Sequence, residues 1–249
     1  MPATEAPELT VVVPVFGNAK RIPELSARLE RAVRHRSYEL LLVDDASPDH
    51  ARTVIRKLAE QNPRVCGIVL AENVGQNNAV LAGLAHARGN AVAVMDGDLQ
   101  DPPEAVPVLL AALERERADA VFAARRGQYE SRLRLATGRL LKRALWLLTT
   151  GRVPPDAGLF LVVQRAVAER VLATAGSDPY VLVLVAYAAR SVTTIPVERG
   201  RGSASSYTGA MRVQLARRAL AAALRLDSGR PTYQVAERIG RRFSVEQPT

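Results

Sequence analysis

Short apolar runs alternate with amphipathic stretches along the first half of the chain. Apolar residues fill almost every position in runs at 10–15, 39–43, 65–70, 91–95 and 120–124, which is typical of strands buried on both faces. Between these runs, apolar residues recur at helical spacing, so we expect helices over 21–34, 49–61, 76–87 and 103–116. This alternation predicts an α/β fold in which helices cover both faces of one mostly parallel sheet.

The pattern is less regular in the second half. We expect a helix over 131–148, a strand over 160–163, a helix over 166–173, a strand over 192–197 and a loop of small residues over 199–207. A basic amphipathic helix follows over 210–226, with Leu215, Leu220 and Leu224 near one face. Such a helix can rest on an anionic membrane surface or pack on the protein core. The tail from Asp227 is polar and rich in arginine, and we expect it to be partly disordered.

The positive charge is concentrated in the second half. The chain carries a formal charge of +9, but residues 1–124 hold 13 basic and 17 acidic side chains, whereas residues 125–249 hold 21 and 8. This asymmetry indicates an anionic partner for the second half, either nucleic acid, membrane lipid or a phosphorylated substrate. Aromatic residues make up only 4% of the chain, which leaves few side chains to stack on bases, and the basic residues form no recognised nucleic-acid-binding module. Nucleic acid is therefore the least favoured partner.

The composition is that of a globular protein, with 48% apolar and 24% charged residues. The single cysteine, Cys66, lies within an apolar run, so we expect a buried, inert thiol and a reducing compartment. Residues 1–8 contain Pro and Glu where a signal peptide needs a basic start and an apolar stretch, and the longest apolar run, 180–189, has ten residues. We therefore expect a cytoplasmic protein without a membrane-spanning helix.

Polar side chains follow the fourth predicted strand directly, in the run Met95-Asp-Gly-Asp-Leu-Gln-Asp-Pro-Pro-Glu104. Ligands of parallel α/β sheets bind at the carboxyl ends of the strands. Mg²⁺ or Mn²⁺ is usually held by one or two carboxylates together with phosphate oxygens, so we expect Asp96, Asp98 and Gln100 to hold such a cation. Asp101 and Glu104 flank two prolines and instead fit the start of a helix.

Two further strand ends carry polar groups. Asp44 and Asp45 end the second strand, and Asn18 follows the first. Because the carboxyl ends of parallel strands meet at one edge of the sheet, we expect these groups to converge on one cleft. Capping the next helix needs only one side chain, Ser47 or Asp49, so the paired aspartates have another role. An aspartate there can accept a hydrogen bond from a nucleobase N–H or a ribose hydroxyl.

Four motifs together resemble a known family. They are Val-Val-Val-Pro-Val-Phe at 11–16, Val-Asp-Asp-Ala-Ser at 43–47, Glu-Asn-Val-Gly-Gln at 72–76 and the acidic run at 95–104. At these spacings the chain resembles the GT-A-fold (Rossmann-like) family 2 glycosyltransferases, and within them dolichol-phosphate mannosyltransferase and the bacterial polyprenyl-phosphate glycosyltransferases. The resemblance is dense over 10–126 and looser to about 208. It implies inverting transfer of a sugar from a nucleotide-sugar donor.

The resemblance also implies roles for particular residues on the donor side. Pro14, Phe16, Asn18 and Asp45 would line the nucleotide pocket, with Asp96 near the ribose or the metal. Asp98 and Gln100 would hold Mg²⁺ or Mn²⁺ on the donor diphosphate. The other donor-binding candidates lie in the matching motifs and in the 199–207 loop, which would close over the diphosphate: Asp44, Asn73, Gly75, Arg201, Ser205 and Tyr207.

On the acceptor side, Arg125, Arg126 and Arg134 fall where the family binds an acceptor phosphate, and the planar fork of arginine suits phosphate. Ordinary solvated arginines are the alternative, above all for Arg134. The leading acceptor is a polyprenyl phosphate. This chain nevertheless departs from the family there: relatives commonly read Asp-x-Gly-Asp-Phe-Arg where this chain reads Asp-Ala-Gly-Leu-Phe-Leu at 156–161, and Asn18 stands where many relatives have Glu.

These departures keep other acceptors and functions open. A soluble hydroxyl-bearing small molecule or a glycan is the second candidate acceptor, and a non-catalytic donor-binding subunit is a further hypothesis. A phosphate acceptor, with a second pKa of about 6, needs no base, whereas a hydroxyl must lose a proton as it attacks. Asp156 is the candidate base, or else a turn residue after two prolines. Asp156 and the metal-binding Asp98 are thus the candidate catalytic residues.

We expect one catalytic domain over 1–209, divided into a donor-binding half (1–124) and an acceptor-side half (125–209), and then a basic helix and polar tail over 210–249. Membrane-bound relatives continue into transmembrane helices, and no apolar span of that kind follows here. A peripheral position at the inner face of the membrane and a homodimer are both compatible with these features.

Overall fold

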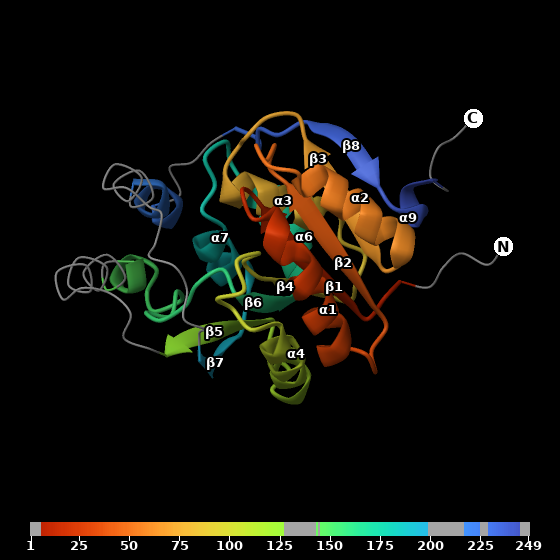
Figure 1. The fold of residues 1–249 in the computed structure, drawn as a ribbon. Coiled ribbons are helices and arrows are strands. Elements are labelled where there is room, and N and C mark those ends of the chain that lie inside the picture. Colours follow the sequence, from red (N-terminus) through yellow and green to blue (C-terminus); the bar gives the residue numbers. More distant parts are fainter. Residues whose placement is uncertain (1–5, 127–142, 144, 199–216, 225–228, 245–249) are drawn as a thin grey trace.

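The described residues form one eight-stranded sheet. The computed structural model describes residues 6–126, 143, 145–198, 217–224 and 229–244. The strand order is β7-β5-β6-β4-β1-β2-β3-β8, and only β6 and β8 run antiparallel to their neighbours (Figure 1). The strands are β1 (Leu9–Val15), β2 (Tyr38–Asp44), β3 (Val65–Leu70), β4 (Ala91–Val94), β5 (Ala120–Arg126), β6 (Leu161–Gln164), β7 (Val192–Glu198) and β8 (Val235–Ile239). The expected mostly parallel α/β sheet is confirmed.

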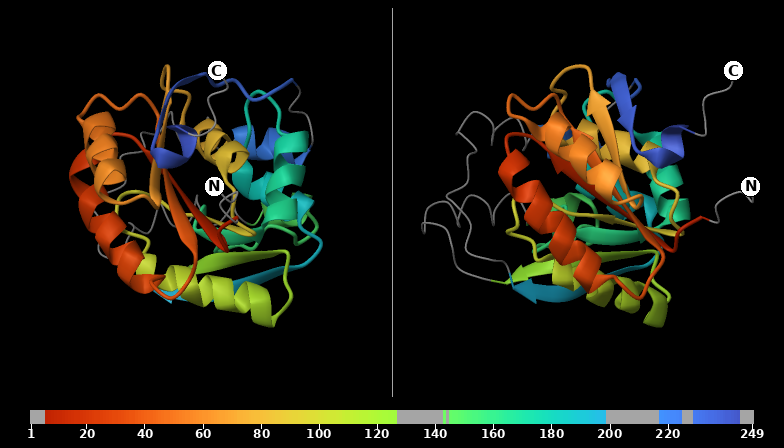
Figure 2. Two further views of the ribbon diagram at one scale, coloured as in Figure 1. Left: turned by 90° about the vertical axis from the view of Figure 1, so that its right-hand side faces the viewer. Right: turned by 45° about the vertical axis from the view of Figure 1, so that its right-hand side comes forward.

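Helices cover both faces of this sheet (Figure 2). One face packs against α1 (Ile22–Ala32), α2 (Ala51–Gln61) and α4 (Val106–Arg115). The other face packs against α3 (Gln76–His86), α6 (Arg165–Thr174) and α7 (Val181–Ala188), together with the helical residues 217–224. Three short elements complete the described set: η1 (Ala19–Arg21), η2 (Pro103–Ala105) and α9 (Arg241–Ser244).

The register of the central strands brings their carboxyl ends to one edge. Val15 at the end of β1 pairs with Asp44 at the end of β2. Val12 pairs with Val94, so β4 ends three residues before β1 does and Met95 begins the following loop beside β1. The antiparallel strand β6 begins at the same edge, because Leu161 pairs with Val94. The loops after β1, β2 and β4 and the loop before β6 therefore meet.

The C-terminal tail, which the sequence predicts to be partly disordered, is ordered over 229–244. Residues 235–239 form β8, which pairs antiparallel with β3 and closes one side of the sheet. Its burial alternates along the strand, as expected for an edge strand with one packed face. Arg238 lies on the exposed face, whereas Glu237 lies on the packed face and pairs with Arg52 and Arg56 of α2. These two charged residues gave the strand the composition of a solvated tail.

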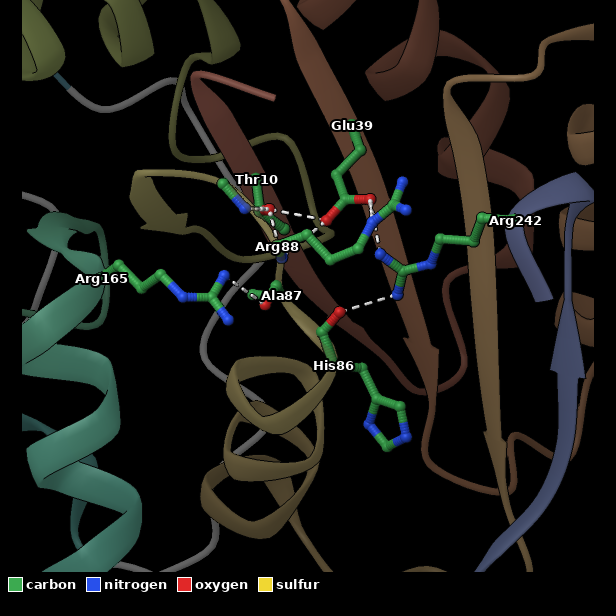
Figure 3. A network of polar contacts seen from close by, with 8 residues as sticks. Thr10, Glu39, His86, Ala87, Arg88, Arg165 and Arg242 are labelled. Atoms are coloured by element: carbon green, nitrogen blue, oxygen red, sulfur yellow. Dashed lines mark hydrogen bonds and ion pairs between the residues drawn. The ribbon is translucent and has the colours of Figure 1, made fainter. Parts of the chain in front are cut away.

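The tail is fastened by a buried ion pair at the amino ends of the central strands (Figure 3). Nη1 of Arg242 lies 2.5 Å from Oε2 of Glu39, and the two side chains are only 6% and 5% exposed. Nη2 of Arg242 also donates to the carbonyl of His86 at 2.8 Å. The hydroxyl of Thr10 donates to Oε1 of Glu39 at 2.7 Å, and the backbone N–H of Arg88 reaches the same oxygen at 3.0 Å. One glutamate thus joins β1, β2, the end of α3 and α9.

Residues 217–224 pack on the core through alanines. Ala219, Ala222 and Ala223 are buried, and the hydroxyl of Tyr187 in α7 donates to the carbonyl of Ala223 at 3.0 Å. Leu220 and Leu224 are instead 43% and 47% exposed. The expected leucine face of this helix therefore points outward in the described part, and the packing face is the opposite one.

Two further helical segments lie in the second half of the chain. The apolar residues 180–189 contain a helix, α7, which the sequence pattern did not distinguish because it is apolar all round. Most of the expected helix 131–148 lies outside the described residues, and residues 145–148 are helical. Within the described ranges, no helix has the length and apolar character needed to cross a bilayer.

Candidate functional site

The paired aspartates at the end of β2 hold two backbone segments. Oδ1 and Oδ2 of Asp45 accept hydrogen bonds from the backbone N–H groups of Val74 and Gly75, at 2.8 and 2.9 Å. Oδ1 of Asp44 accepts from the backbone N–H of Ser47 at 2.9 Å. Asn73 adds a bond from Nδ2 to the carbonyl of Asp45 at 3.3 Å. Asp45 therefore fixes the loop between β3 and α3, which carries the donor-binding candidates Asn73 and Gly75.

Burial shifts the protonation of both carboxyls in the same direction. Asp44 and Asp45 are each 3% exposed. Loss of solvation raises the pKa of both carboxyl groups, while the backbone N–H groups of Ser47, Val74 and Gly75 oppose the rise. The pair thus carries a desolvation cost that the loop contacts partly offset. Such cost is common where carboxylates are retained for binding or catalysis.

The acidic turn after β4 has a strained backbone. Leu99, between Asp98 and Gln100, has φ +61°, and Ala46, after the paired aspartates, has φ +50°. Positive φ is unfavourable for residues with a side chain and is concentrated at ligand sites. Oδ1 of Asp98 accepts from the backbone N–H of Gln100 at 3.0 Å, and Oδ1 of Asp96 accepts from Nε2 of Gln76 at 2.5 Å. Each of the two aspartates of the turn is thus fixed by a hydrogen bond.

The loop after β1 packs directly on this turn. A Cβ built on Gly97 would lie 2.5 Å from Nδ2 of Asn18 and 3.2 Å from the carbonyl oxygen of Pro14. Nη1 of Arg21 donates to the backbone carbonyl of Asp98. Oδ1 of Asn18 is buried and accepts no hydrogen bond from the described residues. The structure therefore brings Pro14 and Asn18 together with Asp96 and Asp98, and leaves a buried acceptor beside the turn.

The loops after β1 and β2 are joined in turn. The backbone N–H of Gly17 donates to Oγ of Ser47 at 3.1 Å, and that of Ala19 donates to Oδ2 of Asp49 at 2.9 Å. Phe16, between them and the strand, is 53% exposed. The N-cap of α2 is His50, and no side chain caps it. Oδ1 of Asp49 nevertheless accepts from the backbone N–H of Ala51, the first residue of α2, at 3.2 Å. Asp49 therefore serves both the start of α2 and the loop after β1, whereas Ser47 contacts the loop and Asp44.

Asp101 and Glu104 are expected to mark the start of a helix, and this is correct for Glu104 only. Glu104 lies in the first turn of η2 and binds Nε and Nη2 of Arg28, each at 2.8 Å. Asp101 is fully buried, but the N-cap of η2 is Pro102 and makes no side-chain capping bond. Asp101 is thus not the capping residue.

The donor set fits a divalent cation that shares its coordination with a diphosphate. Asp96 and Asp98 stand one residue apart on the strained turn, and Oδ2 of Asp98 accepts no hydrogen bond from the described residues. The described residues contain no group of three or more His, Cys, Asp and Glu side chains that could enclose a metal by themselves. Beside nucleotides, Mg²⁺ and Mn²⁺ are commonly held by one or two carboxylates, and phosphate oxygens complete the coordination.

On the acceptor side, the structure describes only part of the predicted set. The backbones of Arg125 and Arg126 end β5 and pair with Val197 and Glu198 of β7. Asp156 is exposed in a turn closed by the backbone bond from Ala157 to Pro154, at 3.0 Å, just before β6. The other predicted residues lie outside the described ranges, namely Arg134, Arg201, Ser205 and Tyr207.

The leucines that replace family residues belong to the core. Leu161 is fully buried in β6, and Leu159 packs against the core cluster on the α3 face. The side chain of Leu161 is therefore not available to an acceptor, and that of Leu159 is half-buried. These two leucines, in which this chain departs from the family pattern, therefore contribute to packing. They lie next to the turn that carries Asp156.

Two residues near the acidic turn were missed. Gln76 reaches Asp96, and Arg21 reaches the carbonyl of Asp98 across 77 positions of sequence. Gln76 lies in a motif that matched the family, and that motif was the available signal. No pattern in the sequence indicates the contact of Arg21, because it depends on how η1 meets the turn.

The sequence and the fold together identify the family. Residues 10–172 match the family model described as glycosyl transferase family 2. The chain therefore belongs to glycosyl transferase family 2, as its motifs indicated.

Among curated proteins, the chain is similar to two undecaprenyl-phosphate 4-deoxy-4-formamido-L-arabinose transferases. It is 35% identical over 201 residues to that of Shewanella sediminis (strain HAW-EB3), covering 78% of this chain and 60% of the relative. It is 32% identical over 194 residues to that of Enterobacter sp. (strain 638), covering 76% and 59%. The chain thus spans about 60% of the length of these relatives.

Solved structures share the fold. A mannosyltransferase from Pyrobaculum calidifontis, in complex with GDP-Man and Mn²⁺, superposes with a TM-score of 0.62 at 22% identity, covering 92% of this chain and 67% of that one. Glucosyl-3-phosphoglycerate synthase from Mycobacterium tuberculosis, in complex with Mn²⁺ and UDP, superposes with a TM-score of 0.65 at 16% identity, covering 96% and 92%. These likenesses confirm the expected GT-A fold.

Proposed function

We propose that this protein is a metal-dependent inverting glycosyltransferase that moves a sugar from a nucleotide sugar to a polyprenyl phosphate. The observation that carries the proposal is the strained acidic turn after β4. It holds Asp96 and Asp98 at the carboxyl edge of the sheet, against the loop that carries Asn18 and against Gln76, which directly follows the loop fixed by Asp45. Membership of glycosyl transferase family 2 supports this assignment.

On the donor side, Asp98, with Asp96 and Gln100, would hold Mg²⁺ or Mn²⁺ on the diphosphate. A bound cation supplies neutralisation of the negative charge that develops on the leaving diphosphate. Pro14, Phe16 and Asn18, together with the loop fixed by Asp45, would form the walls of the nucleotide pocket. The manganese and nucleotide complexes of fold neighbours are consistent with these roles.

A polyprenyl phosphate is the proposed acceptor because the curated relatives are named for transfer to undecaprenyl phosphate. The phosphate, with a second pKa of about 6, attacks without a general base at neutral pH. Arg125 and Arg126 follow the buried part of β5 and would meet the acceptor phosphate.

A hydroxyl acceptor is the second candidate. The observation that favours it is the position of Asp156, exposed in the turn before β6, whose first residue pairs with the last residue of β4. A carboxylate at that edge could take the proton of an attacking hydroxyl. The two candidates differ in one test: Asp156→Asn lowers transfer to a hydroxyl but leaves transfer to a phosphate near the wild-type rate.

We also propose that the protein binds the inner face of the membrane from the cytoplasm. Five large apolar side chains are 39–61% exposed in the two helical segments drawn at the left of Figure 1: Trp146, Leu147, Leu148, Leu220 and Leu224. Exposed apolar side chains near a basic helix are typical of contact with an anionic lipid surface. A homodimer through the same side chains is the alternative, and vesicle flotation at low protein concentration separates the two.

The donor assignment is tested by thermal-shift measurements with UDP, GDP and dTDP, with and without Mn²⁺. A ligand that binds only the folded state raises the apparent stability, by about 2.7 kcal/mol at a hundredfold excess over its dissociation constant. We expect one diphosphate to stabilise the protein only when Mn²⁺ is present, and Asp98→Ala to abolish that shift. Equal melting temperatures under all conditions would refute a donor site.

A further inference from the structure

The helical residues 217–224 bring a guanidinium group to the donor-binding loop. A Cβ built on Gly75 would lie 4.0 Å from Nη1 of Arg218. Leaving out the neighbours of Gly75 in the chain, that nitrogen is the only heavy atom of the described residues within 4 Å of this position. Arg218 therefore faces the start of α3, although it lies far along the sequence.

Two contacts fix this guanidinium in place. Nε of Arg218 lies 2.5 Å from Oδ1 of Asp178, in the loop before α7. The backbone of the helix is anchored by buried Ala219 and by the bond from Tyr187 to Ala223. The side chain of Arg218 is 27% exposed, so the group is neither buried in the core nor fully solvated. Nη1 and Nη2 make no hydrogen bond within the described part of the chain.

Gly75 is close to the acidic turn. Its backbone N–H donates to Asp45, and the next residue, Gln76, donates from Nε2 to Asp96. Arg218 therefore lies beside Gly75, the residue before Gln76, which contacts Asp96. Four aspartates lie in the loops at this edge of the sheet: Asp44, Asp45, Asp96 and Asp98. A positive group at this edge complements a phosphate that is brought there with its cation.

We propose that Arg218 is a further donor-binding residue that contacts the diphosphate of the nucleotide sugar through Nη1 and Nη2. This inference rests on the proposed function and adds a residue outside the family motifs. Asp178 engages Nε, so the two terminal nitrogens keep the planar fork that suits phosphate oxygens. The helix over 217–224 thereby becomes part of the donor site as well as the core.

The test is a set of binding isotherms with Mn²⁺, using UDP or GDP, whichever stabilises the wild type, and the matching nucleoside. Loss of a charge-assisted hydrogen bond to phosphate weakens binding by about tenfold or more. We expect Arg218→Gln to show this loss for the diphosphate and no change for the nucleoside. Arg218→Lys keeps the charge without the fork and should fall between. Arg217→Gln, an exposed neighbour on the same helix, is the matched control and should bind as the wild type does.

The nucleoside measurement separates contact from structure. If Arg218 only supported the loop, Arg218→Gln would weaken nucleoside and diphosphate equally, and the proposal would be overturned. Unchanged diphosphate affinity in Arg218→Gln would overturn it too, while leaving the donor site itself established. A change confined to the KM for the polyprenyl phosphate would move Arg218 to the acceptor and contradict the donor assignment. Absence of any diphosphate binding in the wild type would reject the proposed function, and this inference with it.

Discussion

The buried pair of Arg242 and Glu39 allows a quantitative prediction about the C-terminal segment. Replacing Arg242 with methionine keeps much of the apolar length of the side chain but removes the charge and both hydrogen bonds. The carboxylate of Glu39 would then stay buried, with its side chain 5% exposed. Removing one partner of a buried pair costs about 3–5 kcal/mol.

Three contacts that remain on Glu39 place the loss near the lower limit. The hydroxyl of Thr10 and the backbone N–H of Arg88 still donate to Oε1, at 2.7 and 3.0 Å, and Nε of Arg88 still lies 3.5 Å from Oε2. We therefore expect Arg242→Met to lower the free energy of unfolding by about 3 kcal/mol. For a chain of this length that corresponds to a fall of about 6–12 °C in Tm.

Urea unfolding followed by circular dichroism measures this loss. The matched control is Arg241→Met, an exposed neighbour on α9, which should change the unfolding free energy by less than about 0.5 kcal/mol. Adding Glu39→Gln to Arg242→Met should recover part of the loss, because no uncompensated charge then stays buried. If Arg242→Met is as stable as the Arg241→Met control, the ion pair does not hold the tail and the reasoning is wrong.

Three further predictions concern the site and the core. Gly97→Ala places a Cβ 2.5 Å from Nδ2 of Asn18, so we expect Mn²⁺-dependent diphosphate binding to weaken by about tenfold or more, measured by calorimetry; unchanged affinity would show that the turn tolerates displacement. Burial raises the pKa of Asp45 above 3.8, so its stability contribution is present below that value and is lost as pH rises through the folded-state pKa. Urea titrations should therefore show the wild type losing stability relative to Asp45→Asn as the pH rises above the usual aspartate pKa of about 3.9. Burial raises the pKa of the Cys66 thiol to about 11, so iodoacetamide should label it only after unfolding, as followed by mass spectrometry; rapid labelling of the native protein would contradict the packing.

The sequence predicts the first half of the fold well because its strands are apolar on both faces. The buried run of β3 coincides with its predicted range, 65–70. The edge strand β8 was missed because two of the five residues of Val235-Ala-Glu-Arg-Ile239 are charged, and one of them, Glu237, lies on the packed face, where it pairs with Arg52 and Arg56 of α2. The sequence here shows no alternation of apolar and polar residues, because an inward position holds Glu237 and an outward position holds Ala236.

The candidate site was predictable in its residue types but not in its contacts. Aspartates after apolar strands indicated where ligands gather, and the structure brings these strand ends together. Both carboxylate oxygens of Asp45, however, accept hydrogen bonds from the backbone N–H groups of Val74 and Gly75. Those contacts depend on the path of the loop between β3 and α3, whose residues Val74 and Gly75 lie 29 and 30 positions after Asp45 in the sequence. The approach of Arg218 depends on alanine packing of a helix whose leucines dominate the sequence pattern.

The most direct test of the account is transfer of a labelled sugar from a panel of UDP-, GDP- and dTDP-sugars to polyprenyl phosphate in the presence of Mn²⁺. The account predicts that one donor yields a labelled glycolipid and free nucleoside diphosphate in equal amounts. EDTA should abolish this transfer, and Asp98→Ala should lower its rate by about 100-fold or more. Transfer by the Asp98→Ala protein at the wild-type rate, or undiminished transfer in EDTA, would contradict the central claim that the acidic turn after β4 binds the metal and the donor diphosphate.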